Sequence, residues 1–306
     1  MSHSHNHSHS HSATSRKRLI AALTVTLSIL VAELIGAALS NSLALLADAG
    51  HMAVDSIGLL TATIAAILMT KPRDGHKTWG YARAEVIAAA LQAGMLLILT
   101  AFIATKAISN LMYPSQLHSG PMMIFGAIGL LANLISLAIL AGGRKDNLNM
   151  RAAFLEVATD ALGSVAVIIA AGLAMVTGWN SWDAIASLII VAMMAPRAFI
   201  LLRNALRILM ETAPEELDLD EVRKHIMEVD HVEDVHDLHV TTIGTGIVAL
   251  TAHVTVDDSC FYDGHSIGIL HEIQDCVASH FPISISHSTI QIDTAAHRDN
   301  ELLQHD

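Results

Sequence analysis

The first two thirds of the chain consist of six long apolar runs separated by short polar segments. A helix of about 20 apolar residues spans the hydrocarbon core of a bilayer, and each run is near or above that length. The pattern therefore predicts an α-helical membrane domain of six transmembrane helices within residues 16–210. The runs cover residues 19–39, 43–70, 86–112, 120–141, 152–176 and 183–204.

The pattern of polar and apolar positions changes beyond Pro214. Two segments have the periodicity of amphipathic helices, and three others alternate polar and apolar residues as half-buried strands do. Their order predicts a small α+β domain of the αββαβ type, ferredoxin-like or metallochaperone-like, over residues 211–294, followed by a loose tail at 295–306. The predicted helices are 218–229 and 264–281, and the predicted strands are 233–242, 248–256 and 287–293.

Charge is distributed unevenly between these two parts. Residues 1–210 hold 14 Lys and Arg against 9 Asp and Glu, whereas residues 211–306 hold 3 against 20. The connections after the second and fourth runs are rich in basic residues, so the positive-inside rule predicts a multi-pass protein of the plasma (inner) membrane with both termini in the cytoplasm. The acidic part disfavours nucleic acid as a partner and favours cations. The only cysteines, Cys260 and Cys276, are compatible with a reducing cytosol.

Residues 1–15 form a polar leader in which histidine alternates with serine or asparagine. Short histidine-rich tracts bind metal ions without folding. The leader is interpreted as a disordered, metal-binding segment, and part of an expression tag is the alternative. The histidines concerned are His3, His5, His7, His9 and His11.

Two pairs of ionisable residues lie inside apolar runs at a spacing of four. His51 and Asp55 form the first pair, and Glu156 and Asp160 form the second. This spacing puts both side chains of a pair on one face of a helix. A charged group in the bilayer core is costly and needs a partner or a function. A single such histidine or acid is more often satisfied within the protein, but two pairs facing each other would make a four-ligand site for a divalent metal ion.

Other acids lie in or near the spans. Asp48, one turn before His51, is predicted to line the outer exit rather than to bind the ion. Glu33 is compatible with a hydrogen bond to a neighbouring helix and also with a place on the ion pathway. Asp183, next to Trp182, is predicted to lie at the membrane interface.

Several motifs together resemble the cation diffusion facilitator family, and most closely its bacterial zinc transporters. They are LLADAGHM with the following Asp55, WGYARAE, NLNMRAAFLEV with the following DALGSV, and the C-terminal HSTIQ. The resemblance covers about residues 15–294. It implies a homodimer that exports Zn²⁺ or a related divalent ion, without a further cofactor, in exchange for protons.

The resemblance assigns the transport site to His51, Asp55, Glu156 and Asp160. Zinc-selective relatives commonly have histidine where this chain has Glu156. One imidazole and three carboxylates form a harder ligand set, which should tolerate Cd²⁺, Co²⁺, Mn²⁺ and Fe²⁺ better, although Zn²⁺ also accepts carboxylate oxygen. Zinc remains the first expectation.

The resemblance also implies metal sites outside the membrane. A C-terminal site would use His236, His253, His265 and Asp293, although Gln291 stands where some relatives have histidine. Ordinary surface histidines are the alternative interpretation. A weaker loop site would use Asp74, where a solvated loop is the alternative. Arg83 and Glu211 match positions that form a charged interlock near the dimer contact of a relative, and an ordinary surface pair is equally compatible.

Metal and proton compete for such a membrane site, because the ion needs neutral imidazole and ionised carboxylates. We therefore expect alternating access with protons as the counter-ion. Two rival functions remain: a metal-gated divalent cation channel, and a membrane-anchored metal sensor or buffer. An enzyme is not expected, since no nucleophile–base pair, phosphate loop or HExxH motif occurs.

Overall fold

The computed structural model describes residue 24 and residues 27–141 and 148–299. The predicted leader at 1–15, the start of the first apolar run and residues 300–306 of the predicted tail lie outside the described residues. The chain divides into two units, residues 1–60 with 91–200 and residues 61–90 with 201–306. Each unit is described by itself.

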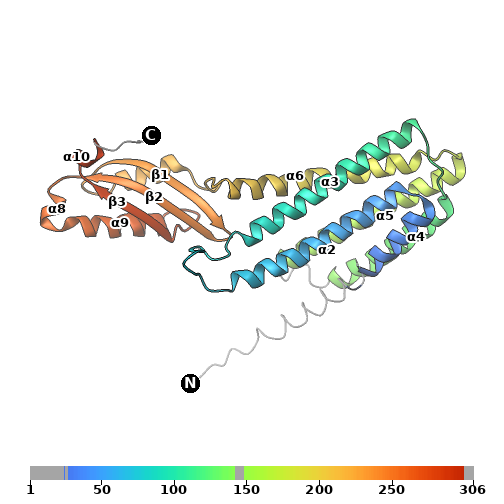
Figure 1. Ribbon diagram of the computed structural model, residues 1–306, viewed down its shortest axis with the longest axis horizontal. Helices are drawn as coiled ribbons and strands as arrows, with labels where there is room; N and C mark the ends of the chain where they lie inside the picture. The colour runs from blue at the N-terminus through green and yellow to red at the C-terminus, as the bar shows by residue number, and fades with distance from the viewer. Residues whose placement is uncertain (1–23, 25–26, 142–147, 300–306) are drawn as a thin grey trace, which may run out of the picture. The chain divides into compact units, whose positions relative to one another are not determined.

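Long apolar helices make up the membrane-spanning part (Figure 1). Five helices within the described residues are long and apolar enough to cross a membrane, which confirms five of the six predicted spans. The described part of the first run is a shorter apolar helix, Leu27–Ser40. The five are α2 (Leu43–Met69), α3 (Ala84–Met112), α4 (Ser119–Ala141), α5 (Leu148–Thr177) and α6 (Trp182–Leu209).

Large aliphatic side chains cover the outside of these helices. Ile98 is 73% exposed and Val176 is 86% exposed, and many other leucines and isoleucines are similarly uncovered. A water-soluble protein rarely leaves so much contiguous apolar surface uncovered. The exposed aliphatic surface is therefore the surface that faces lipid.

Helices α4 and α5 pack closely and run in opposite directions. Glycine permits this approach, since a Cβ at Gly126 would lie 2.9 Å from Val167 Cγ1. A Cβ at Gly129, also on α4, would lie 2.5 Å from Oε1 of Glu33, which belongs to the shorter helix Leu27–Ser40. Small residues let membrane helices approach each other, and here Gly129 also makes room for a buried acid.

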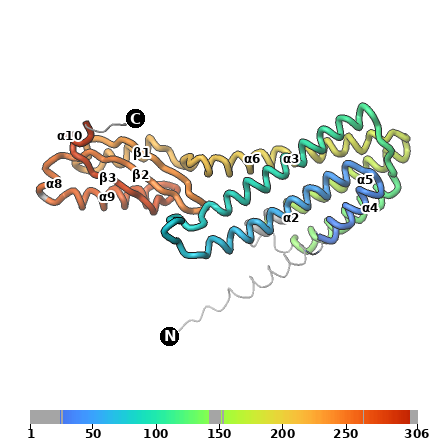
Figure 2. Tube along the Cα trace, viewed as in Figure 1, coloured from blue at the N-terminus to red at the C-terminus, as the bar shows by residue number. Residues whose placement is uncertain are grey.

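The C-terminal domain is a three-stranded sheet with helices packed on it (Figure 2). The strand order is β1-β2-β3, with β1 and β2 antiparallel and β2 and β3 parallel. This confirms the predicted αββαβ order. The elements are α7 (Leu219–Met227), β1 (Val232–Gly244), β2 (Ile247–Val256), α8 (Cys260–Asp263), α9 (His265–Ser279), β3 (His287–Asp293) and α10 (Ala295–Arg298).

The two short helices were not predicted. Residues 295–298 were expected to be loose, yet they form the single turn α10. The side chain of Thr294 accepts a hydrogen bond from the backbone N–H of His297 at 3.3 Å. This is the usual way in which a threonine starts a helix, and in so short a segment the cap outweighs the polar composition.

The core of this domain follows the periodicities of its sequence. Val222 and Ile226 lie four residues apart on α7, and Ile269, Ile273 and Val277 do so on α9. Alternate residues of β2 face these helices, among them Leu250 and Val254. The fold therefore buries one stripe of each helix against one face of the sheet.

Strand β1 contains an irregularity that matters for the site below. Its register with β2 shifts between His236 and His239, and Asp237 there has a φ of 49°. Aspartate tolerates this left-handed conformation better than most residues. The bulge leaves His236 directly opposite His253 on β2.

Candidate metal-binding sites

The candidate transport site lies where α2 and α5 meet (Figure 1). His51 Nε2 is 3.4 Å from Asp55 Oδ2, one turn along α2, and 3.5 Å from Asp160 Oδ1 of α5. The His51 residue is only 5% exposed. The structure thus brings three of the four predicted ligands into direct contact.

Glu156, the fourth predicted ligand, lies at the edge of this cluster. It interacts with Asp55, and its Oε1 is 3.2 Å from Nη2 of Arg197 on α6. Arg197 was missed in the sequence, although the signal was present: it is a charged residue inside an apolar run, next to Pro196. A third helix therefore supplies a positive charge to the site.

Helix α3 contributes a second unpredicted partner. Gln92 Nε2 donates a hydrogen bond to Asp55 Oδ1 at 3.1 Å. A Cβ at Gly58 would lie 2.1 Å from Gln92 Cδ, so the glycine is what lets the amide reach across to α2. Gln92 orients Asp55 without adding charge.

Two more buried acids extend the polar cluster. Glu33 is 1% exposed and interacts with Asp48 through their carboxyl groups. Asp48 in turn interacts with Ser164, whose hydroxyl donates to the backbone carbonyl of Asp160 at 3.2 Å. A series of polar contacts therefore links Asp160, one of the candidate ligands, through Ser164 and Asp48 to the buried Glu33.

Asp183 is buried within the protein at the start of α6. Its carboxylate accepts hydrogen bonds from Ser42 Oγ at 2.5 Å, from Leu43 N at 2.8 Å and from Ala44 N at 3.1 Å. These donors are at the N-terminus of α2, where backbone N–H groups lack partners within the helix. Asp183 joins the start of α6 to the start of α2.

The donor set of the membrane cluster suits a divalent transition metal. Zinc binds imidazole nitrogen and carboxylate oxygen at about 2.0–2.2 Å, usually in a tetrahedron. The edge of such a tetrahedron is about 3.3–3.6 Å, which matches the two separations measured from His51. Among the described residues, no three or more His, Cys, Asp or Glu side chains are arranged as a ready-made metal site.

A second cluster joins the three strands of the C-terminal domain. The His236 and His253 rings lie 5.4 Å apart between centroids, and His253 Nδ1 is 3.6 Å from Asp293 Oδ2. The side-chain amide of Gln291 also faces this cluster, and its Nε2 donates hydrogen bonds to Asp293 Oδ1 at 3.1 Å and to Oδ2 at 3.0 Å. Three of the four predicted residues are therefore neighbours.

Two further histidines belong to the description of this cluster, the predicted His265 and the unpredicted His297. The ring of His265 stacks on that of His231, with centroids 6.0 Å apart. His297 of α10 instead places its Nε2 3.6 Å from Asp293 Oδ1. No local pattern in the sequence points to His297, because its position depends on the unpredicted turn of α10.

The side chain of Asp74 stabilises the loop in which it lies. Its Oδ1 accepts hydrogen bonds from the backbone N–H of Lys77 at 2.7 Å and of His76 at 2.8 Å. The bond from Lys77 has the larger effect, and together the two bonds hold the pKa of the Asp74 carboxyl below its usual value. In this arrangement the carboxylate shapes a turn.

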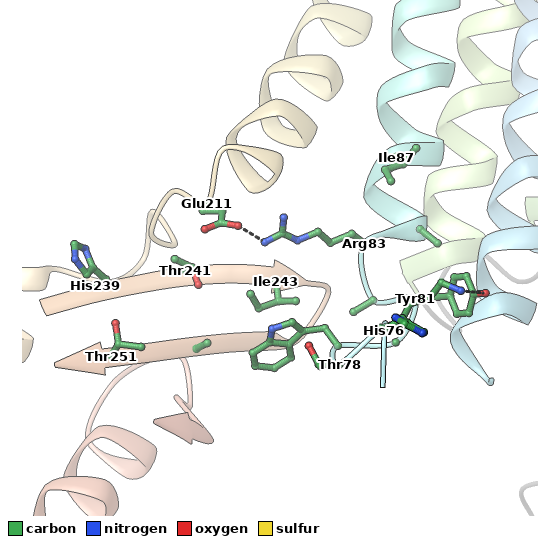
Figure 3. A pocket seen from close by; sticks show the side chains of 16 residues that line it. His76, Thr78, Tyr81, Arg83, Ile87, Glu211, His239, Thr241, Ile243 and Thr251 are labelled. Carbon is green, nitrogen blue, oxygen red and sulfur yellow. Dashed lines mark hydrogen bonds and ion pairs between the residues drawn. The ribbon is translucent and has the colours of Figure 1, made fainter. Parts of the chain in front are cut away.

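The same loop lines a cavity of about 940 Å³ together with β1 and β2 (Figure 3). Arg83 Nη2 lies 2.6 Å from Glu211 Oε1 on one side of it. Ala82 packs with Ile243 and Ala249, and a Cβ at Gly244 would lie 2.5 Å from the Ala82 carbonyl oxygen. The predicted pair of Arg83 and Glu211 is thus present, next to a point where the backbone of this loop packs directly against the sheet.

Two family models match the chain. The model described as cation efflux transmembrane domain matches residues 19–210, and the model described as cation efflux protein, cytoplasmic domain, matches residues 214–295. Together they cover both structural parts of the chain.

Curated relatives match over nearly the full length. The metal cation efflux system protein CzcD of Cupriavidus metallidurans is 36% identical over 284 residues, 93% of this chain and 88% of the relative. The cadmium, cobalt and zinc/H(+)-K(+) antiporter of Bacillus subtilis is 36% identical over 291 residues, 94% of this chain and 92% of the relative. The zinc transporter ZitB of Escherichia coli is 37% identical over 294 residues, 95% of this chain and 92% of the relative.

Proposed function

The chain belongs to the cation diffusion facilitator family, and we propose that it exports Zn²⁺ or a similar divalent cation from the cytoplasm in exchange for protons. The similar ions are Cd²⁺, Co²⁺, Mn²⁺ and Fe²⁺. The observation that carries this proposal is the buried imidazole of His51 between Asp55 and Asp160 of a second helix. The names of the relatives, which mention zinc, cadmium and cobalt, support the same class of substrate.

The proposed ligands of the transported ion are His51, Asp55, Glu156 and Asp160. The imidazole of His51 contacts two carboxylates, and Glu156 is paired with Arg197. An entering ion replaces these contacts with bonds to the same atoms. Because the ion needs neutral imidazole and ionised carboxylates, its binding releases protons, and protons entering from the other side displace it.

The proposed orientation places both termini in the cytoplasm and the protein in the plasma (inner) membrane, as a homodimer. The basic residues of the connections support this orientation, and the match of residues 214–295 to a cytoplasmic domain agrees with it. The cluster of His236, His253 and Asp293 is proposed to bind a regulatory metal ion, which would reduce the repulsion between two acidic domains.

Purified protein in proteoliposomes provides the test. With a lumen more acidic than the outside, an antiporter accumulates Zn²⁺ in the lumen, and collapsing the pH gradient with an ionophore stops the accumulation. Flux that ignores the gradient would identify a channel. Binding without any flux would identify a sensor or buffer.

The ligand assignment is tested in the same vesicles. Asp55→Asn and Asp160→Asn should each abolish accumulation and the release of protons on adding Zn²⁺. Asp220→Asn makes the same substitution on the exposed surface of α7 and should leave both unchanged. Normal accumulation by either membrane variant would refute the site.

A further inference from the structure

We infer that Arg197 is the permanent counter-charge of the four proposed ligands, so that these ligands, the bound ion and Arg197 together carry no net charge. This inference rests on the proposed function, and it adds a residue from α6 whose role is electrostatic rather than ligating. It starts from the ion pair between Arg197 Nη2 and Glu156 Oε1 at 3.2 Å.

The charges of the site can be counted from the residues present. Asp55, Glu156 and Asp160 carry three negative charges when ionised, and His51 is neutral when it acts as a ligand. One divalent ion cancels two of these charges and leaves one. The guanidinium of Arg197 cancels the last, and it stays charged at every relevant pH.

The balance matters because the site works within a membrane. A net charge in a medium of low dielectric constant carries a large solvation cost, which a carrier would meet at each change of access. An arginine inside an apolar helix is costly for the same reason unless it has a partner. The two side chains are 56% and 35% exposed, so the protein alone does not cover them, and their pairing reduces both costs.

Arg197 also competes with the metal ion for Glu156. The guanidinium interacts with the same carboxylate that the ion is proposed to use. Its charge repels a divalent ion at close range. Arg197 should therefore weaken binding and speed release, which a carrier needs as much as it needs capture.

These two effects have opposite signs in an experiment. Arg197→Gln should tighten equilibrium binding of Cd²⁺ several-fold, since a unit charge acting on a divalent ion within a protein is worth about that much even when well screened. The maximal rate of Cd²⁺ export at saturating metal should fall about tenfold, because the loaded site now carries a net negative charge. Arg197→Lys keeps the charge and should stay within about threefold of the unmodified protein in both measurements.

A charge-balanced double variant separates this role from mere structural support. Glu156→Gln alone leaves the loaded site with one positive charge, and Arg197→Gln alone leaves it with one negative charge. Both single variants should export slowly at saturating metal, and the double variant should export faster than either. Arg203→Gln is the matched control, because it makes the same substitution six residues further along α6.

The readouts are Cd²⁺ binding by calorimetry on full-length protein in detergent and Cd²⁺ flux in proteoliposomes. Unchanged binding and rate in Arg197→Gln would overturn the inference, as would a double variant slower than both single ones. Weaker binding together with slower export in Arg197→Gln would point to damaged structure and overturn it too. If the unmodified protein bound Cd²⁺ but moved none, the proposed function would fail, and the sign of the change in affinity would still decide the role of Arg197.

Discussion

The buried carboxylate of Asp183 makes the sharpest prediction about stability. It is 3% exposed and accepts hydrogen bonds from Ser42 Oγ and from the backbone N–H groups of Leu43 and Ala44. Ser42 Oγ also accepts from Leu45 N at 3.2 Å. The first turn of α2 therefore depends on a side chain that comes from the start of α6.

Asp183→Ala removes the acceptor and leaves two buried backbone N–H groups without their partner. Each buried unsatisfied donor costs about 1–3 kcal/mol, and the lost attraction between a carboxylate and a helix N-terminus adds to this. We expect a total loss of about 2–6 kcal/mol from these terms. Asp183→Asn keeps one acceptor oxygen and should lose less.

The assay is thermal unfolding of the full-length protein in detergent, followed by size-exclusion chromatography with tryptophan detection. At roughly 2 °C per kcal/mol for a chain of this size, Asp183→Ala should lower the midpoint by about 4–12 °C. Asp218→Asn is the control, because Asp218 caps α7 at the protein surface by accepting from Asp220 N and asparagine caps helices equally well.

A midpoint for Asp183→Ala within 1 °C or so of the unmodified protein would refute the reasoning. A large loss for Asp218→Asn would also refute it, because the effect would then not depend on burial. An equal loss for Asp183→Asn and Asp183→Ala would show that charge, rather than the number of acceptor atoms, holds the two helices together.

Three further predictions concern the C-terminal half and its loop. Gly244→Ala puts a Cβ 2.5 Å from the Ala82 carbonyl oxygen, so the loop should pack less closely on the sheet and trypsin should cut it at Lys77 faster. Gly268→Ala is the control, because nothing lies within 4 Å of its Cβ and the cutting rate should not change. Equal cutting rates in the two variants would contradict the packing of the loop on the sheet. His297→Ala should weaken Zn²⁺ binding at the C-terminal cluster several-fold, and Gln291→His should strengthen that binding. Both are measured by calorimetry on a transport-site variant, with His271→Ala, at an exposed position, as the control. Unaltered affinity in His297→Ala would exclude His297 as a ligand. Burial, with help from Glu228 and Glu272, raises the pKa of the Cys276 thiol, so its contribution to stability is present below the pKa of the unfolded chain and is lost as the pH rises through the folded value. In a Cys260→Ser background the folded protein should therefore react slowly with a maleimide at pH 7.5, and labelling as fast as in denaturant would be evidence against this environment.

Much of this protein follows from its sequence because the relevant patterns are local. The length of an apolar run determines whether a helix can cross a membrane, and the spacing of His51 and Asp55 determines that they share a helix face. The order of alternating and helical segments likewise predicted the αββαβ domain. Each of these inferences needs only residues close together in the chain.

Tertiary structure decided which helix faces which. The rotation of a helix about its axis is set by packing against its neighbours, and glycines such as Gly58 and Gly129 decide how near a partner comes. No local pattern brings Gln92 to Asp55, Arg197 to Glu156 or Asp183 to the start of α2. A single capped turn likewise put His297 beside Asp293. The sequence determined which groups the membrane must neutralise, and only the packing of distant segments decided which groups neutralise them, because burial makes each charge depend on partners that the chain brings in from elsewhere.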